Sequence, residues 1–263
     1  MPLVIYGLQI PQSGIMAGTC TVVIPTLNEE ANILNMAKCL REMYPDFKIM
    51  FMDDNSTDRS RELIEGLNDP LTQIVVRDPA KSGLAASVFD GILGCGTDYF
   101  MTFDCDFQHS PSALGDMYRK MEETGCDLCV GDREDRFALG FVRWAGSWAF
   151  NIFADVYLLF RGKSVTKDVM SGLFAGRTDV FVPVIEENFD QLEMKGWKVL
   201  LDLLKFGPKD LHITKVKYKF NKRAAGESHI SPRVVISTFR QCGWFGGICA
   251  RVYAKVKRVD MNF

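Results

Sequence analysis

The chain of 263 residues lacks any uninterrupted run of the roughly 18 apolar residues that a membrane-spanning helix needs. Its two longest apolar stretches, 139–160 and 234–250, are both interrupted by charged or amide side chains. We therefore expect no segment to cross a membrane unaided, although either stretch can lie on a membrane surface. Residues 1–18 lack the basic start of a secretory signal and are expected to be a loose leader.

Two glycine motifs of nucleotide-binding proteins are also missing. No G-x-G-x-x-G follows the first predicted strand, where the turn is Pro-Thr-Leu-Asn at 25–28, and no G-x-x-x-x-G-K-[ST] occurs. These absences argue against a dehydrogenase and a P-loop kinase or ATPase. Histidine is scarce as well, and His109, His212 and His229 are too scattered to suggest a tri-histidine metal centre.

The eight cysteines lack the spacing of a disulfide framework, which fits a reducing compartment. Cys126 and Cys129 form a C-x-x-C, but no second pair follows and the segment is predicted to be a strand. Core packing is therefore favoured over redox or zinc chemistry there.

What is present is an alternation of short apolar runs with segments of helical period. The composition, 47% hydrophobic and 24% charged, is that of a soluble globular domain. Strictly alternating elements predict an α/β fold with a mostly parallel sheet and helices on both faces. Thr57 and Ser110 are expected to be helix N-caps. The predicted strands are 21–25, 48–52, 73–76, 99–103 and 127–130, and the predicted helices are 29–43, 58–67, 82–93 and 111–123.

The second half is less regular. It predicts an amphipathic helix over 139–160, a strand over 173–176, a helix over 191–204 and an alternating strand over 212–220. The helix over 139–160 carries Phe141, Trp144, Trp148, Phe153 and Tyr157. These aromatic side chains suit two alternatives that the sequence leaves open, docking an isoprenoid chain or headgroups and packing on the sheet.

The net charge of −2 conceals an asymmetry. From Lys205 to the end there are 13 Lys and Arg against three acids, so this part carries +10 and residues 1–204 carry −12. A basic tail suits an anionic membrane face or phosphate ligands. It shows no nucleic-acid recognition motif, so we expect no nucleic-acid partner.

Polar clusters follow three of the predicted strands, at 25–30, 53–58 and 104–109. Ligands of open α/β sheets bind beyond the carboxyl ends of the strands, so these clusters are expected to meet at one rim. Asp104, Asp106 and Gln108 offer the hard oxygen ligands that Mg²⁺ and Mn²⁺ prefer. A D-x-D triplet alone arises easily by chance, but three converging clusters favour a site over solvated loops.

The same clusters carry a family resemblance. Segments 23–30 (VIPTLNEE), 52–58 (MDDNSTD) and 104–109 (DCDFQH) resemble the signature of family 2 glycosyltransferases, which have the GT-A fold, a Rossmann-like sheet. Three further segments resemble the polyprenyl-phosphate glycosyltransferase branch, above all dolichol-phosphate mannosyltransferases: 130–133 (VGDR), 167–172 (KDVMSG) and 223–228 (RAAGES). The resemblance implies a GT-A domain over 19–232, between the leader 1–18 and a basic amphipathic tail over 233–263.

By this resemblance, the donor half of the site is implied residue by residue. Pro25, Leu27, Glu29, Asp54 and Asp104 line the nucleotide-sugar pocket, and Leu27 stands where the family usually has Tyr. Ala85 likewise replaces a common Gly in the small-residue turn that approaches the donor. The implied metal ligands for Mg²⁺ or Mn²⁺ are Asp104, Asp106 and Gln108.

The acceptor half is implied by four residues, Arg133, Arg143, Ser147 and Arg223. A lipid phosphate monoester arrives ionised, so no general base is needed, and guanidinium groups suit its oxygens. Asp106 and Arg133 are the residues expected to matter most for catalysis.

The reaction implied is inverting transfer of mannose from GDP-mannose to dolichyl or another polyprenyl phosphate. The implied location is the cytoplasmic face of a membrane, endoplasmic reticulum in a eukaryote or plasma membrane in a prokaryote, reached directly or through a membrane-anchoring partner subunit. Three alternatives stay open: a UDP-glucose or other UDP-sugar donor, a non-catalytic subunit with the same fold, and a peripheral protein that uses only its basic tail.

Overall fold

The structure is a computed structural model that describes residues 19–134, 141–221 and 232–259. Within these ranges, seven strands form one sheet in the order β3-β2-β1-β4-β6-β5-β7. β6 runs antiparallel to both of its neighbours, and the remaining neighbouring strands are parallel. The strands are β1 Cys20–Thr26, β2 Lys48–Asp53, β3 Thr72–Val76, β4 Tyr99–Thr102, β5 Leu128–Arg133, β6 Phe174–Arg177 and β7 Ile213–Tyr218.

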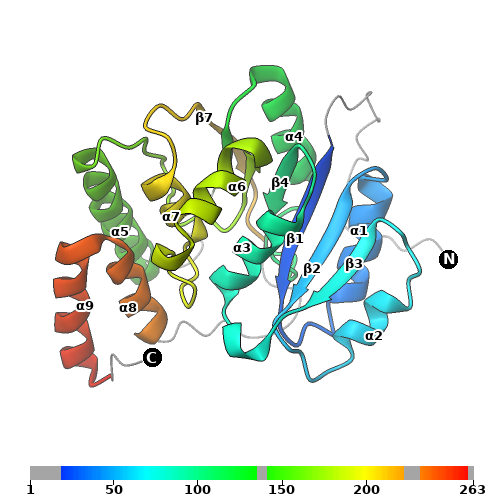
Figure 1. Cartoon of the computed structure of the whole chain (residues 1–263), viewed down its shortest axis with the longest axis horizontal. Coiled ribbons are helices and arrows are strands. Elements are labelled where there is room, and N and C mark those ends of the chain that lie inside the picture. The colour runs from blue at the N-terminus through cyan, green and yellow to red at the C-terminus, as the bar shows by residue number, and fades with distance from the viewer. Residues whose placement is uncertain (1–18, 135–140, 222–231, 260–263) are drawn as a thin grey trace.

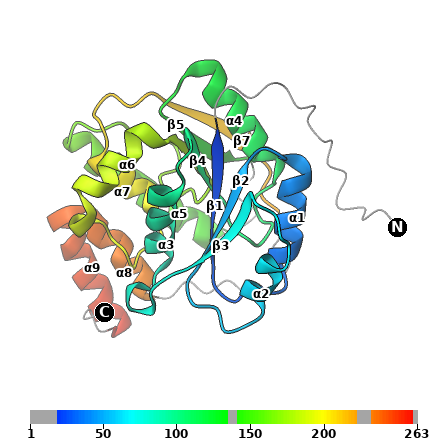
Figure 2. The ribbon, with the colours of Figure 1, turned by 45° about the vertical axis from the view of Figure 1, so that its right-hand side comes forward.

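Helices cover both faces of the sheet, as the alternating pattern predicted (Figure 1). Figure 2 shows α1 on one side of the strands and α3, α6 and α7 on the other. Separate apolar clusters fill the two sides, one including α1 and α4 and the other including α3, α5, α6 and α7. The helices are α1 Ile33–Met43, α2 Ser60–Glu65, α3 Leu84–Gly94, α4 Ser112–Thr124, α5 Phe141–Phe160, α6 Thr178–Glu187, α7 Val199–Phe206, α8 Pro232–Gln241 and α9 Gly243–Lys257.

Local patterns explain the elements around the centre of the sheet. In β1, Val22, Val23 and Ile24 are fully buried, as expected of a central strand that is covered on both faces. In α1, buried side chains recur at Ile33, Met36, Ala37 and Leu40, the spacing of one helical face. β1 thus becomes the fixed middle of the sheet, with β2 on one side and β4 on the other.

Helices α8 and α9 lie beside α5 (Figure 1), and α8 is hydrogen-bonded to α7 and to the residues just before it. The amide of Gln241 donates to the carbonyl of Lys198 at 3.1 Å and to Asp202 at 2.9 Å. The indole of Trp197 donates to Thr238 at 3.1 Å. Among the described residues, no helix is long and apolar enough to span a membrane.

Several boundaries predicted from the sequence are wrong. Helix α7 begins at Val199 rather than at 191, although 191–195 are good helix formers and Gly196 is the one poor helix former before it. The carbonyls of Met194 and Gly196 instead accept hydrogen bonds from Ala86 and Ala85, so contacts with α3 override local propensity. The N-cap positions also differ, because Arg59 precedes α2 and Pro111 precedes α4, rather than Thr57 and Ser110.

The predicted core role of the C-x-x-C pair is confirmed. Cys126 and Cys129 are fully buried within the apolar cluster beneath α1 and α4. Burial raises the pKa of the Cys129 thiol to about 12, which opposes the thiolate that redox or zinc chemistry requires.

Helix α5 packs on the fold through one face, which is one of the two alternatives that the sequence left open. Ala154 and Leu158 are fully buried, and Phe153 and Tyr157 pack against the same cluster. A second face is exposed, with Trp148, Ile152, Val156, Leu159 and Phe160 along it. The side chains of Phe141 and Trp144 lie outside the described part of the chain.

The carboxylate of Asp155 on α5 is expected to make the stability of the protein depend on pH. One oxygen of Asp155 is buried and has no hydrogen-bond partner among the residues that the structure describes. Burial, then the nearby charge of Asp168, raises the pKa of this carboxyl to about 6. Because the folded pKa lies above the unfolded value near 4, stability is lost as pH rises from about 4 through 6. We expect Asp155→Asn to stabilise the protein at pH 7 by about 1 kcal/mol.

Thermal unfolding between pH 4 and 7 measures this effect. The gain of Asp155→Asn in Tm should shrink towards zero at pH 4. Asp190 is exposed, so Asp190→Asn serves as the control and should change Tm little at any pH. A constant gain across the pH range would contradict the assignment to the Asp155 carboxyl.

Candidate active site

The three polar clusters do meet at one rim of the sheet. β1 lies between β2 and β4, where the strand order reverses, which is the position at which open α/β sheets bind ligands. A cavity of about 810 Å³ opens there. The sequence-predicted residues that line this cavity are Pro25, Leu27, Glu29, Asp54, Asp104, Asp106, Gln108, Arg133 and Ser147.

The Asp104–Asp106 segment follows β4 and turns back on itself. Asp106 is 4% exposed, and its carboxylate accepts the backbone N–H of Gln108 at 3.0 Å. Phe107 has a φ of +60°, which lets the chain reverse at this point. The turn keeps Asp104, Asp106 and Gln108 together at the end of β4.

Asp104 is oriented by a buried histidine. His109 Nε2 lies 3.0 Å from an Asp104 oxygen, and the imidazole is 2% exposed whereas 43% of the Asp104 side chain is exposed. Burial alone would raise the pKa of Asp104, but the His109 hydrogen bond and the charges of His109, Lys198 and Arg133 together lower it. Asp104 is therefore held as a carboxylate that opens into the cavity.

These oxygens fit a hard divalent cation that also binds phosphates. Two carboxylates and an amide offer only part of an octahedral shell, as expected where Mg²⁺ or Mn²⁺ takes its other ligands from water and substrate. No cluster of three or more His, Cys, Asp or Glu suited to a metal occurs among the described residues. The donor set thus suits a cation shared with a ligand better than a closed structural site.

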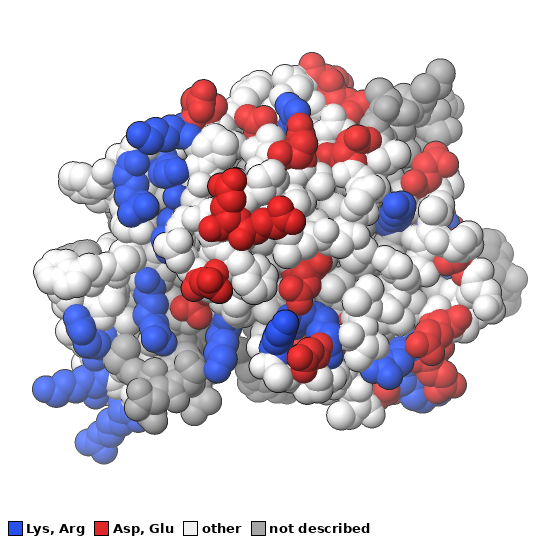
Figure 3. All heavy atoms as spheres, viewed as in Figure 1, with Lys and Arg blue, Asp and Glu red and all other residues white. Residues whose placement is uncertain are grey.

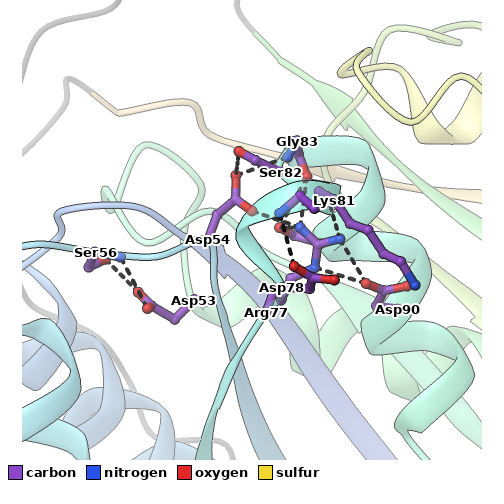
Figure 4. Close-up of polar contacts among 11 residues, drawn as sticks. Asp53, Asp54, Ser56, Arg77, Asp78, Lys81, Ser82, Gly83 and Asp90 are labelled. Carbon is purple, nitrogen blue, oxygen red and sulfur yellow. Dashed lines mark hydrogen bonds and ion pairs between the residues drawn. The ribbon is translucent and has the colours of Figure 1, made fainter.

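Asp54, at the end of β2, is fixed by a buried arginine (Figure 4). Arg77 follows β3, its side chain is 3% exposed, and its guanidinium lies between Asp54 at 2.7 Å and Asp90 at 2.8 Å. The other Asp54 oxygen accepts the Ser82 hydroxyl at 2.7 Å and the Gly83 N–H at 2.9 Å. Arg77 therefore connects Asp54, on the predicted nucleoside side of the cavity, to the turn before α3.

That turn requires glycine at position 83. Its φ is +155°, and a Cβ placed there would lie 2.5 Å from the carbonyl oxygen of Met194. Arg77 also donates to the carbonyl of Lys81 at 2.9 Å and so stabilises this turn. Leu84 and Ser87, just beyond the turn, line the cavity.

We expect Arg77→Lys to weaken binding of a nucleoside diphosphate about tenfold, because a single ammonium cannot span Asp54, Asp90 and the Lys81 carbonyl. The free energy of unfolding should also fall, by about 2 kcal/mol, since two partly buried carboxylates lose part of their pairing with a buried cation. Calorimetric titration with GDP and with UDP, together with chemical unfolding, measures both effects.

Arg41 supplies a matched control. It makes a comparable network, with Asp69 at 2.7 Å and the carbonyls of Pro45 and Phe47, but it does not line the cavity. Arg41→Lys should lower stability and leave nucleotide affinity unchanged. Equal losses of affinity in both variants would mean that Arg77 only stabilises the fold.

The opposite side of the cavity is basic. Arg133, at the end of β5, lies over the Phe220 ring with 4.5 Å between its guanidinium carbon and the ring centre. Its buried Nε has no hydrogen-bond partner among the described residues. Ser147 reaches the cavity from α5. The side chain of Arg143 and all of Arg223, also predicted for this side, lie outside the described part of the chain.

Sequence reasoning missed three residues at this site: Arg77, His109 and Lys198. His109 has a local signal, since it stands five residues after Asp104. Arg77 and Lys198 have none, because each reaches the site only through contacts with segments distant along the chain.

Known structures of similar architecture are glycosyltransferases. Glucosyl-3-phosphoglycerate synthase from Mycobacterium tuberculosis, solved with Mn²⁺, UDP and glucosyl-3-phosphoglycerate, matches with a TM-score of 0.58 and 16% identity. The match covers 86% of this chain and 81% of that one. A second structure of that enzyme, with Mn²⁺, UDP and phosphoglyceric acid, matches with a TM-score of 0.59 and 17% identity over 86% and 79%. The fold is that of the GT-A glycosyltransferases, as the resemblance implied.

The family to which the chain belongs is shown by comparison of its sequence with a family model. The model of "Glycosyl transferase family 2" matches residues 21–183, more than half of the chain. The chain is a glycosyltransferase that belongs to this family, and the matched residues include all three strand-end clusters.

Characterised relatives are similar over most of the chain. Dolichol-phosphate mannosyltransferase from Pyrococcus furiosus is 27% identical over 84% of this chain, which spans only 61% of that protein. Dolichol-phosphate mannosyltransferase from Saccharomyces cerevisiae is 27% identical over 84% of both chains. Undecaprenyl-phosphate mannosyltransferase from Micrococcus luteus is 27% identical over 81% of this chain and 88% of its own.

Proposed function

We propose that this glycosyltransferase transfers mannose from GDP-mannose to a polyprenyl phosphate such as dolichyl phosphate. The observation that carries the proposal is that carboxylates, Asp104 and Asp106, and a guanidinium, Arg133, line one cavity. Two phosphate-bearing substrates need such a site, one bound through a cation and the other through side chains. The names of the dolichyl- and undecaprenyl-phosphate relatives support both substrate classes.

The proposed reaction needs no general base. The acceptor phosphate is already anionic near neutral pH, so one of its oxygens attacks the anomeric carbon of the donor directly. The bond from that carbon to the nucleoside diphosphate breaks, and the diphosphate leaves with the electron pair. Attack from the opposite side inverts the anomeric centre and gives a β-linked mannosyl phosphate lipid.

The protein's own contribution is orientation and charge. Arg133 holds the acceptor phosphate in line with the sugar, with Ser147, Arg143 and Arg223 proposed as further ligands. Pro25, Leu27, Glu29 and Asp54 hold the nucleoside. Asp104, Asp106 and Gln108 would hold Mg²⁺ or Mn²⁺, whose positive charge stabilises a leaving diphosphate when it is bound.

We further infer that the protein works at the cytoplasmic face of a membrane, directly or with an anchoring partner subunit. Exposed Trp148, Val156 and Phe160 of α5 and Trp244 of α9 offer apolar surface. Lys and Arg side chains project where α9 lies (Figure 3), and α9 carries Arg251, Lys255 and Lys257. Exposed apolar side chains together with basic ones suit an anionic bilayer surface. The tail at 233–263 is proposed as this membrane-facing part, and 19–232 as the catalytic domain.

A UDP-sugar donor, such as UDP-glucose, is the second candidate. Leu27 is 54% exposed at the cavity and cannot supply the ring or hydroxyl of the Tyr usual in the family. Fewer side-chain contacts with the nucleotide base reduce the selectivity between guanine and uracil.

A transfer assay tests the proposal. Purified protein is incubated with radiolabelled GDP-mannose, dolichyl phosphate in vesicles and Mg²⁺ or Mn²⁺, and organic extraction measures the labelled lipid. We expect product that requires the lipid phosphate and disappears with chelator. Dolichol without its phosphate is the matched control and should give none. Hydrolysis of the donor without lipid product would contradict the proposed acceptor.

A further inference from the structure

Lys198 is a buried cation in the wall of the cavity, and no substrate role follows for it from the sequence. It directly precedes α7 and is 7% exposed. Its ammonium donates to the carbonyl oxygen of Met170 at 2.7 Å and lies 3.9 Å from the centre of the Trp197 ring. Met170 and Trp197 line the same cavity.

The partners of this ammonium are few for a buried charge. Buried lysines are usually paired with a carboxylate, because transfer of a charge from water is costly. An ammonium has three N–H donors. Among the described residues, the Lys198 ammonium contacts one carbonyl oxygen and one aromatic ring. Burial, then the neighbouring charge of Arg133, lowers the pKa of Lys198 to about 8, against the opposing effect of the Asp168 and Asp104 charges.

Lys205 on the same helix shows the usual arrangement. It also lies against an adjacent ring, that of Phe206 at 4.5 Å, but Asp202 stands 3.8 Å from its ammonium. Lys205 does not line the cavity. Within the described part of the chain, the two lysines thus differ in two features, a carboxylate at ion-pair distance and access to the cavity.

The position of Lys198 indicates what it faces. Arg133, close enough to depress the pKa of Lys198, lines the same cavity, and its buried Nε has no hydrogen-bond partner in the described part of the chain. Two cations that repel each other gain from an anion bound between them. Arg133 ends β5, and Lys198 directly precedes α7, in a segment where the Gly196 carbonyl accepts the Ala85 N–H of α3.

We propose that Lys198 binds the phosphate group of the acceptor together with Arg133. The inference rests on the proposed function for the identity of the acceptor. The ammonium supplies donors to the phosphate oxygens that the flat guanidinium of Arg133 leaves free, so the attacking oxygen is held from two directions.

A role in phosphate binding and a role in stabilising the fold predict different effects when the Lys198 charge is removed. A charge kept buried for a ligand is a net cost to the empty protein, so its removal should not destabilise the fold. We expect Lys198→Met to unfold at the same or a higher temperature than the wild type while binding phosphate less tightly. Lys198→Gln keeps a donor for the Met170 carbonyl and provides a second variant.

The test is calorimetric titration of the full chain with citronellyl phosphate, a short prenyl phosphate, and separately with GDP. Citronellol, which lacks the phosphate, measures the apolar contribution. Both Lys198 variants should bind citronellyl phosphate at least tenfold more weakly, with GDP affinity within about twofold of wild type. Lys205→Met should bind both ligands as the wild type does.

Three results would overturn the inference. Unchanged binding of citronellyl phosphate would remove the role, a loss confined to GDP would assign Lys198 to the donor diphosphate, and a marked fall in Tm would make it structural. The proposed function fails separately, if the wild type binds citronellyl phosphate but transfers no sugar to any polyprenyl phosphate.

Discussion

Asp106→Asn is expected to lower kcat/KM for sugar transfer by about 10³-fold, the largest effect of any single change at this site. The variant keeps an oxygen that can accept the Gln108 N–H, which Asp106 accepts at 3.0 Å, so the turn after β4 should persist. What it loses is the negative charge that would hold a cation against the donor diphosphate. Initial rates at saturating Mn²⁺ measure the loss.

Asp116→Asn is the control for this experiment. Asp116 is exposed on α4 and pairs with Arg119, away from the cavity. It should leave both rate and Tm within experimental error. An Asp106→Asn enzyme with most of its activity and a normal metal requirement would remove Asp106 from the proposed ligands.

Arg133→Lys is expected to have the next largest effect, about a 10²-fold loss of kcat/KM for the lipid phosphate. Lysine keeps the charge but not the two-pronged geometry of guanidinium, and it loses the flat stacking on Phe220. Affinity for GDP should stay within about twofold, because Arg133 lies on the acceptor side. Steady-state kinetics with varied dolichyl phosphate, and titration with GDP, separate the two substrates.

Arg177→Lys is the matched substitution. Arg177 ends β6 and pairs with Asp127 and Asp179, and because β6 is antiparallel it lies at the opposite rim of the sheet. Its variant should retain full activity. Equal losses in GDP and lipid phosphate binding by Arg133→Lys would contradict a division of the cavity into two sides.

Much of the acidic side could be predicted from sequence for a simple reason. The carboxyl ends of parallel strands meet at one edge, so finding Asp54 after β2 and Asp104 after β4 was enough to bring them together. Pattern and topology carry that inference without any knowledge of side-chain packing.

Other parts of the site and of the sheet are positioned by contacts that the local sequence does not encode. Lys198 reaches the cavity because the segment before α7 is held away from a helix by hydrogen bonds to α3. Arg77 looks like an ordinary charged residue after a strand, and only the folded chain shows it buried between Asp54 and Asp90. The antiparallel β6 likewise takes its place through pairing with β4 and β5, from distant parts of the chain.

The choice of donor sugar tests the account most directly. GDP-mannose, GDP-glucose, UDP-glucose and UDP-galactose are compared at equal concentration with dolichyl phosphate and Mn²⁺, and the labelled lipid is quantified for each. We expect a mannolipid from GDP-mannose at a rate at least tenfold above that with any other donor. Lipid product from a UDP-sugar alone, or none from GDP-mannose, would contradict it.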